Sequence, residues 1–280
     1  MVKVFDGSIE PLSREDEEIL KMAANIINEA EKQKIVLRIL GAIAIFLHGG
    51  EFANLYKKLG RLPDRKNLFT DIDLIGYSSQ RLKIREFFED FLKFSPDLHV
   101  LLISEGKRLI YHPPGKSFHI DVFFDTLSFS HDVPFGKKPG KGRLELDFPT
   151  VTPTDLLLEK LQIHEINEKD LIDLIVLLRS HEYSDQDEKD KINSKYIASL
   201  LADDWGFWFD ATSNLRKLSK YVENCYKNRI IQMQDKEDVL QKVNQLLKII
   251  EEEPKTKKWK RRAKIGTSKP WFRTVEEIIR

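Results

Sequence analysis

The sequence contains a single cysteine, Cys225, among its 280 residues. An intramolecular disulfide is therefore excluded, and such cysteine usage favours a reducing, cytoplasmic setting. No apolar run reaches about 18 residues, the length that a membrane-spanning helix needs, and the N-terminus lacks the apolar core of a signal peptide. We therefore expect a cytoplasmic protein that has no membrane partner.

The sequence also has no large excess of positive or negative charge. The chain carries 46 Lys and Arg against 45 Asp and Glu, for a formal net charge of +1. Such a balance provides no global attraction to nucleic acid, so any basic binding surface must be local. With 41% hydrophobic and 32% charged residues, the composition is that of a globular protein with one large domain or two modest ones.

Periodicity and turn signals predict an α/β (α+β) fold over residues 1–183 and a helical C-terminal region over 184–280. Helices are expected over residues 13–33, 42–47, 81–94, from about 153, over 168–180 and within 191–250. Strands are expected over residues 35–40, 68–76, 99–103, 107–111, 117–124 and 143–148, with a loop between 48 and 67.

Two aspartates lie within the apolar stretch Leu68–Gly76, which is typical of a buried strand. Strand alternation places Asp71 and Asp73 on one face and their apolar neighbours on the other. Paired carboxylates against an apolar strand are costly unless a partner neutralises them, and a divalent cation is a common partner. An Asp-x-Asp pair also occurs by chance in surface loops, so this pair alone does not establish a metal site.

A second apolar strand, His119–Asp125, carries a further carboxylate at Asp121. If the two strands are neighbours, Asp121 converges with Asp71 and Asp73, and three carboxylates suit two Mg²⁺ ions. Asp125 lies on the same face as Asp121 and is the alternative third ligand, nearer the strand end. The competing interpretation is that Asp121 pairs with a nearby Lys or Arg.

A strand, a glycine and a buried helix follow one another around Gly41. Such a junction lets backbone N–H groups approach a phosphate at a helix N-terminus. A tight turn that merely packs the helix explains the same residues.

The order of these motifs resembles the nucleotidyltransferase superfamily that includes DNA polymerase beta, and within it the AbiEii/AbiGii toxin-like type of bacterial toxin–antitoxin systems. The resemblance covers about residues 35–180 and rests on five features. They are the strand–glycine–helix junction at Gly41, the motif Thr70–Leu74, the later strand Ile120–Val122, and the helices with Leu156–Leu161 and Lys169–Leu174.

The resemblance implies a nucleotidyltransferase-like mixed sheet flanked by helices, two Mg²⁺ ions and an NTP substrate. Asp71 and Asp73 would bind both ions, and Asp121 would be the third ligand and the general base. These three residues are therefore the expected catalytic and metal-binding set.

Other matched positions imply nucleotide binding. Gly41 and Ala42 would form the phosphate-facing turn; the family prefers Gly-Gly or Gly-Ser there, so a serine hydroxyl is missing. Lys66 and Thr70 match the polar residues that precede the metal-binding strand in the family. Lys160 would contact the nucleotide phosphates. A surface lysine with a shielded stem is the other interpretation of Lys160.

Asp170 and Asp173 match the last family motif, where the role is uncertain. Asn167 before Asp170 also suits a helix cap, so a structural role for Asp170 is equally open.

The C-terminal stretch Lys255–Lys264 contains seven basic residues around Trp259. Basic residues with interleaved aromatics suit an RNA backbone and a stacked base, as for a tRNA-like acceptor, whereas a solvated tail accounts for the same composition. A cognate antitoxin is the other partner that the resemblance implies.

These observations lead to one principal expectation and one alternative. The first is a Mg²⁺-dependent enzyme that transfers an NMP from an NTP to a hydroxyl of RNA, tRNA or protein. The alternative is a catalytically inactive nucleotidyltransferase-fold module that binds or regulates. Metal-dependent phosphoester hydrolysis would use similar carboxylates.

Overall fold

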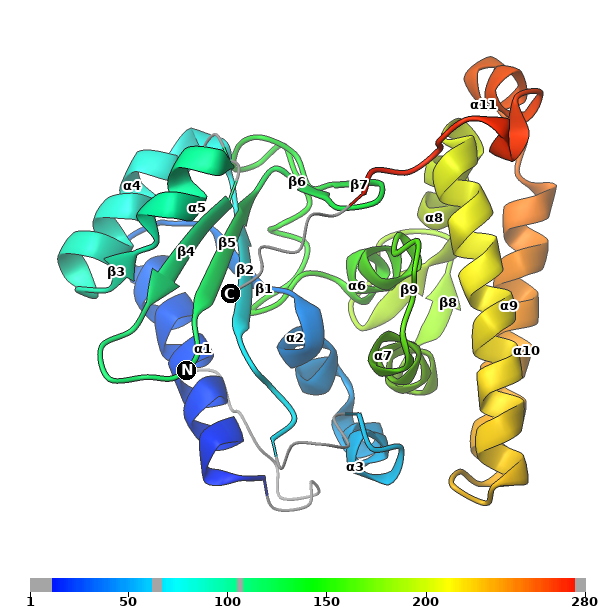
Figure 1. Ribbon diagram of the computed structural model, residues 1–280, viewed down its shortest axis with the longest axis horizontal. Coiled ribbons are helices and arrows are strands. Elements are labelled where there is room, and N and C mark those ends of the chain that lie inside the picture. Colours follow the sequence, from blue (N-terminus) through cyan, green and yellow to red (C-terminus); the bar gives the residue numbers. More distant parts are fainter. Residues whose placement is uncertain (1–11, 62–66, 105–107, 275–280) are drawn as a thin grey trace. The chain divides into compact units, whose positions relative to one another are not determined.

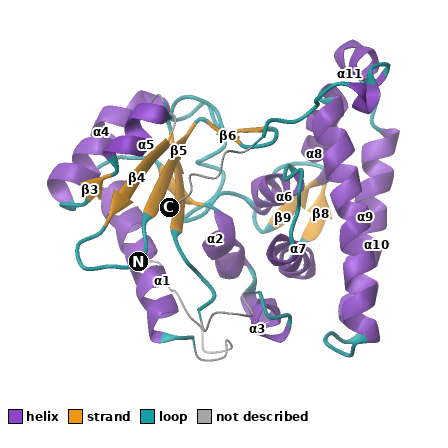
Figure 2. Ribbon diagram, in the orientation of Figure 1, coloured by secondary structure: helices purple, strands orange, loops and turns teal. Residues whose placement is uncertain are grey.

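The computed structural model describes residues 12–61, 67–104 and 108–274 (Figure 1). Its fold is mixed α/β, as the sequence predicts, with the strands confined to short segments between many helices (Figure 2). The chain forms two units, each assembled from separate segments. Unit 1 comprises Met1–Asn54, Leu62–Leu127 and Pro134–Thr152, and unit 2 comprises Leu55–Arg61, Ser128–Val133 and Pro153–Arg280.

Unit 1 contains a five-stranded mixed sheet with the order β1-β2-β5-β4-β3. Only the central pair, β2 and β5, is parallel, and the other neighbours are antiparallel. The strands are β1 (Leu37–Ile39), β2 (Ile72–Gly76), β3 (Ser95–Pro96), β4 (Arg108–His112) and β5 (Ile120–Phe124). Every residue of β5 is buried, which fits the apolar character of this segment.

The predicted start of the first helix is confirmed. Ser13 caps α1 (Arg14–Lys32) by accepting a hydrogen bond from the backbone N–H of Asp16, and one apolar stripe of the helix is buried. The other helical segments of unit 1 are α2 (Gly41–His48), the 3₁₀ turns Gly50–Asn54 and Ser78–Gln80, α4 (Arg81–Glu86), the π-helical turn Phe87–Phe91 and α5 (Leu98–Ile103).

Two predicted strands are wrong. Residues 98–103 form α5 because Asp97 accepts hydrogen bonds from the backbone N–H groups of His99 and Val100, which caps a helix start. Residues 143–148 form turns, with the N–H of Leu146 bonded to the carbonyl of Arg143. The expected loop over 48–67 also contains helical turns.

Unit 2 is mainly helical. Its helices are α3 (Leu55–Lys58), α6 (Pro153–Leu161), α7 (Glu168–Ser180), α8 (Ser194–Asp203), α9 (Trp205–Lys227), α10 (Met233–Glu252) and α11 (Lys257–Ala263). The parallel strands β8 (Glu182–Ser184) and β9 (Lys191–Asn193) lie between α7 and α8 in the sequence. A further short pair, β6 (Thr126–Ser128) and β7 (Asp132–Pro134), includes residues of both units. Asn167 caps α7 as predicted. In the described ranges, no helix is both long and apolar enough to cross a bilayer.

The division differs from the expected boundary at 183/184. Helices α6 and α7 belong to the same unit as the C-terminal helices, so the change occurs at Pro153. The two earlier segments of unit 2 also come from within the range that was expected to form one α/β domain. The composition of the sequence changes at residue 184, but the boundary between the two packed units does not lie there.

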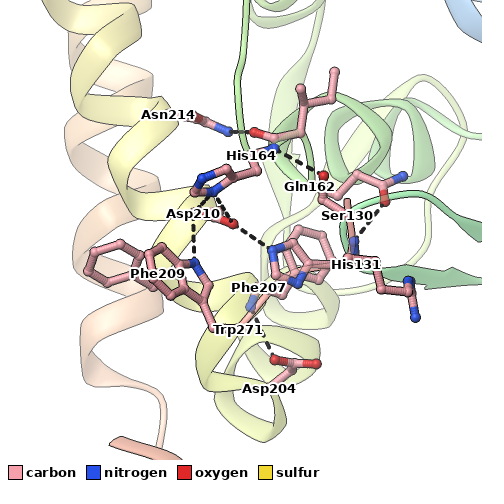
Figure 3. Close-up of polar contacts among 12 residues, drawn as sticks. Ser130, His131, Gln162, His164, Asp204, Phe207, Phe209, Asp210, Asn214 and Trp271 are labelled. Atoms are coloured by element: carbon pink, nitrogen blue, oxygen red, sulfur yellow. Dashed lines mark hydrogen bonds and ion pairs between the residues drawn. The ribbon is translucent and has the colours of Figure 1, made fainter. Parts of the chain in front are cut away.

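Within unit 2, the buried carboxylate of Asp210 contacts side chains from three other segments of the chain (Figure 3). Asp210 on α9 lies 2.7 Å from His131 Nε2 and 3.0 Å from His164 Nδ1, and it accepts a 3.1 Å hydrogen bond from Trp271 Nε1. Burial alone would raise the pKa of Asp210, but the hydrogen bonds from His131, Trp271 and His164 lower it below its usual value. The charged carboxylate is therefore the form that this arrangement stabilises.

Candidate active site

The two aspartate-bearing strands are neighbours, as expected. β2 and β5 run parallel, and Asp73 is the direct register partner of Asp121. Partners on adjacent parallel strands project from the same face, and alternation puts Asp71 on that face as well. The sheet therefore brings three carboxylates from two distant segments to one face of unit 1.

A histidine extends this arrangement to four side chains. The backbone N–H of Ile72 donates to the carbonyl of His119, which fixes His119 directly before the first row of the β2–β5 ladder, Ile72–Ile120. His119 Nε2 lies 3.2 Å from Asp121 Oδ2 and 4.0 Å from Asp71 Oδ2. His119 is thus part of the candidate site, although no role was predicted for it. Its position two residues before Asp121, on the same predicted strand, is the sequence signal that could have identified it.

Arg108 on β4 is a second site residue, which the sequence analysis did not single out. Its contact with Asp121 agrees with the competing interpretation that this aspartate pairs with a nearby Lys or Arg. The Nε and Nη2 atoms of Arg108 donate to the two oxygens of Asp121 at 3.0 Å and 2.8 Å. Burial would raise the pKa of Asp121, but His119 and Arg108 hold it below its ordinary value. Burial likewise opposes the charge of Arg108, whereas Asp121, Asp73 and Asp71 together raise its pKa.

The donor set suits a hard divalent cation because carboxylate oxygens are the ligands that Mg²⁺ prefers. Two features of the geometry must change when an ion binds. Arg108 holds both oxygens of Asp121. Among the described residues, the three carboxylates also do not form a group whose ligand atoms all lie within 4.8 Å of one another. Asp71, whose side chain is 38% exposed, has the most room to rotate toward the other two.

Gly41 lies directly against one of these carboxylates. A Cβ atom at this position would be 2.6 Å from Asp73 Oδ2, and the backbone has φ +69°. The backbone N–H of the preceding residue, Leu40, donates to the carbonyl of Asp73 at 3.0 Å. Both the close approach and the left-handed conformation require glycine here. The start of α2, including Ala42, is therefore held beside the aspartate face.

Replacing Gly41 by alanine tests this requirement. The added Cβ collides with the Asp73 carboxylate, and alanine disfavours the left-handed conformation by about 1–2 kcal/mol. We expect at least that loss in the free energy of urea-induced unfolding, together with weaker Mg²⁺ binding. Gly60→Ala is the matched control because Gly60 has φ +65° with no atom near its missing Cβ. An equal loss of Mg²⁺ affinity in both variants would show that the Asp73 contact is irrelevant.

A buried aspartate of α1 holds the chain segment that precedes Asp71. Asp16 accepts hydrogen bonds from the backbone N–H groups of Leu68 and Phe69 at 2.7 Å and 3.0 Å. This contact anchors the chain just before Thr70, which is exposed. Lys66, the other polar residue predicted for this segment, lies outside the described residues.

Lys160 belongs to unit 2, where carboxylates surround it. Its Nζ is 3.0 Å from Asp173, 3.2 Å from Asp170 and 3.6 Å from Glu159. Burial opposes the charge, but these carboxylates raise the pKa of Lys160. The exposed surface lysine is therefore the wrong interpretation of this residue. Asp170 and Asp173 are partners within the same buried cluster, which gives both a structural role.

Asp125, the alternative third ligand, serves a different purpose. It follows the end of β5 with φ +61°, and its Oδ1 accepts a 2.8 Å hydrogen bond from the backbone N–H of Ser78. That contact favours Asp121 over Asp125 as the third carboxylate of the site.

Comparisons of the chain with family models, with curated proteins and with solved structures found no match. Function is therefore inferred from the residues and their geometry.

Proposed function

We propose that this protein is a metal-dependent nucleotidyltransferase that moves an NMP from an NTP to a hydroxyl acceptor. The observation that carries the proposal is the in-register pair Asp73 and Asp121 on parallel neighbouring strands. Asp71 lies on the same face, and Gly41 leaves space beside Asp73 that a side chain would fill. Motifs far apart in the sequence, each weak alone, thus meet at one place.

The proposed roles follow from charge and position. Asp71, Asp73 and Asp121 would hold Mg²⁺, which when bound polarises a phosphoryl group and activates an attacking oxygen. Asp121 accepts the proton of the acceptor hydroxyl once Arg108 has released it. The freed guanidinium then suits the negative charge of a triphosphate, because its fork of donors matches phosphate oxygens. Lys160 is not needed for this scheme, since buried carboxylates already occupy its ammonium group.

Labelled nucleotides provide the direct test. The protein is incubated with each α-³²P-labelled NTP, Mg²⁺ and either total RNA or a cell extract, and the labelled product is identified. Transfer predicts label on a macromolecule and release of pyrophosphate, whereas phosphoester hydrolysis releases inorganic phosphate. Calorimetry that detects no Mg²⁺-dependent NTP binding by the wild-type protein would overturn the enzymatic proposal.

A second candidate function is a catalytically inactive module that binds or regulates. The bidentate Arg108–Asp121 pair favours it, because an arginine that contacts both oxygens of Asp121 competes with an ion for them. The Arg108→Gln variant separates the two functions. For an enzyme, its transfer rate changes, whereas an inactive module transfers no label in either form.

RNA is the acceptor that the C-terminal residues favour. The predicted tail is in fact the helix α11, capped by Thr256. Two of its basic residues have structural partners, because Lys258 pairs with Asp203 at 3.0 Å and Arg262 donates to backbone carbonyls at 2.7–3.2 Å. Trp259 packs edge-on against Trp208, so its ring is already in use and is not the expected base-stacking platform.

The remaining exposed basic side chains of this region are Lys257, Lys260, Arg261 and Lys264. Replacing all four by glutamine is expected to weaken binding of single-stranded RNA and to reduce its salt dependence. The slope of log K against log salt should fall by about 3, since each phosphate contact contributes about 0.7.

Fluorescence anisotropy with labelled RNA between 50 and 200 mM salt, a range over which such contacts change affinity strongly, measures both effects. A variant with the same change of charge on α9 is the control, made by replacing Arg216, Lys217, Lys220 and Lys227 with glutamine. If the two variants lose affinity equally, α11 is not the RNA-binding surface.

A further inference from the structure

His119 completes a two-by-two arrangement of ligand-type side chains. Asp73 faces Asp121 across the β2–β5 pair, and Asp71 and His119 lie two residues earlier, one on each of the two segments, directly before the Ile72–Ile120 row. All four side chains project from one face because they are two residues apart on each strand. A histidine is thus built into a site whose other members are carboxylates.

The imidazole points at the carboxylates and is held in place. His119 is 5% exposed and Asp121 is 3% exposed. Nε2 lies 3.2 Å from Asp121 and 4.0 Å from Asp71. Two ligands that each bind one ion at about 2.1 Å are about 3.0 Å apart when adjacent and about 4.2 Å apart when opposite. Both observed distances lie between these limits, and the 3.2 Å contact is a hydrogen bond while no ion is bound. Among the described residues, His119, Asp71 and Asp121 do not form a group whose ligand atoms all lie within 4.8 Å, so Asp71 has to move closer when an ion binds.

The charges of the site suit one resident dication. Three aspartates and Arg108 give a formal charge of −3 + 1 = −2 on this face. A single divalent ion neutralises it, and a second ion would arrive with the charge of a nucleotide triphosphate. The identity of the resident ion then depends on its ligands. Mg²⁺ prefers oxygen alone, whereas first-row transition ions also accept an imidazole nitrogen.

We propose that His119 supplies a nitrogen ligand to the resident ion, so that the site selects Mn²⁺ over Mg²⁺. This inference rests on the proposed function, because it concerns the metal of the same site. Asp121 and His119 form the buried half of the site. When the ion enters, Arg108 releases Asp121, and the more exposed Asp71 turns toward the ion. The same arrangement explains why a buried histidine lies between two aspartates.

Metal titration of the whole protein tests the selectivity. Free Mn²⁺ is measured by its EPR signal, and Mg²⁺ affinity is obtained by competition. We expect Mn²⁺ to bind the wild-type protein at least about 10-fold more tightly than Mg²⁺. In His119→Gln and His119→Asn, Mn²⁺ affinity should fall about 10–100-fold, while Mg²⁺ affinity changes less than about threefold. His112→Gln is the control, since His112 is half-exposed and pairs with Asp97 at 3.6 Å.

A measurement on the unmodified protein complements the variants. The electron spin echo of bound Mn²⁺ should show coupling to a directly coordinated ¹⁴N nucleus, and this coupling should persist in His112→Gln. Absence of the coupling would overturn the inference. Equal losses of Mn²⁺ and Mg²⁺ affinity in His119→Gln would do the same, because they indicate that His119 only orients Asp121.

Failure of the inference is distinguishable from failure of the proposed function. If the wild-type protein binds both ions equally, and Asp71→Asn abolishes both, a Mg²⁺ site exists and only the role of His119 is refuted. If the wild-type protein binds neither ion, the proposed function fails, and the selectivity fails with it.

Discussion

Replacing both Asp71 and Asp73 with asparagine is expected to abolish metal-dependent nucleotide binding and to reduce nucleotidyl transfer by at least about 1,000-fold. The same change should leave the metal-free protein as stable or more stable. Both aspartates share a face with Asp121, and Arg108 is the arginine that all three carboxylates act on. With two charges removed, the Arg108–Asp121 pair that remains is electrically balanced.

Calorimetry with ATP and Mg²⁺ measures the first effect, and thermal unfolding in EDTA measures the second. The double variant Glu165→Gln/Asp185→Asn serves as a control with the same charge change at exposed positions. Mg²⁺-dependent nucleotide binding that survives in the Asp71/Asp73 variant would place any nucleotide site elsewhere in the chain.

Asp173→Asn is expected to produce the largest loss of stability. Asp173 is fully buried and bonds to Arg61 at 2.6 Å and 3.1 Å and to Lys160 at 3.0 Å. Removing one member of a buried ion pair leaves its partner uncompensated and typically costs about 3–5 kcal/mol. Two cations, Arg61 and Lys160, would then lack this partner, and Lys160 would keep its contacts with Asp170 and Glu159.

The same residue predicts a dependence on pH. Burial would raise the pKa of Asp173, but Lys160 and Arg61 lower it to about 2. Since the pKa of an aspartate in an unfolded chain is about 3.9, the folded state binds this proton more weakly. The resulting stability, about 2–3 kcal/mol, is fully present above the unfolded pKa and is lost as the pH falls toward 2.

Urea unfolding at several pH values between neutral and 2 tests both statements about Asp173. The Asp173→Asn variant should lose stability at neutral pH and should lack this component of the acid dependence. Glu188→Gln is a suitable control because the Lys191–Glu188 pair is exposed, so its loss should cost less than about 1 kcal/mol. Equal effects in the two variants would contradict the buried-network explanation.

Local signals in the sequence predicted the helix starts and the central strands. Ser13 and Asn167 cap their helices because a side-chain oxygen satisfies a free backbone N–H, which depends only on nearby residues. The apolar stretches around Asp73 and Asp121 form buried strands because a nearly continuous apolar run suits a strand that is covered on both faces. The prediction that these two strands are neighbours in the sheet is confirmed, because they pair directly.

Other features depend on contacts between distant residues, which the sequence does not display. Arg108 reaches Asp121 only because β4 lies beside β5. The stretch after Asp97 reads as a strand from its apolar residues, but the cap formed by this aspartate makes it a helix. Lys160 matched a family motif, yet its charge is balanced by carboxylates of α6 and α7.

The interleaving of the two units constrains how this protein can evolve. Residues 55–61 and 128–133 belong to unit 2, although unit 1 supplies the chain before and after them. A single genetic crossover at residue 152 would transfer a helical unit without Arg61 and His131, the partners of Asp173 and Asp210. We therefore expect the two units to be inherited together, and natural fusions of either unit alone to require compensating changes at both aspartates.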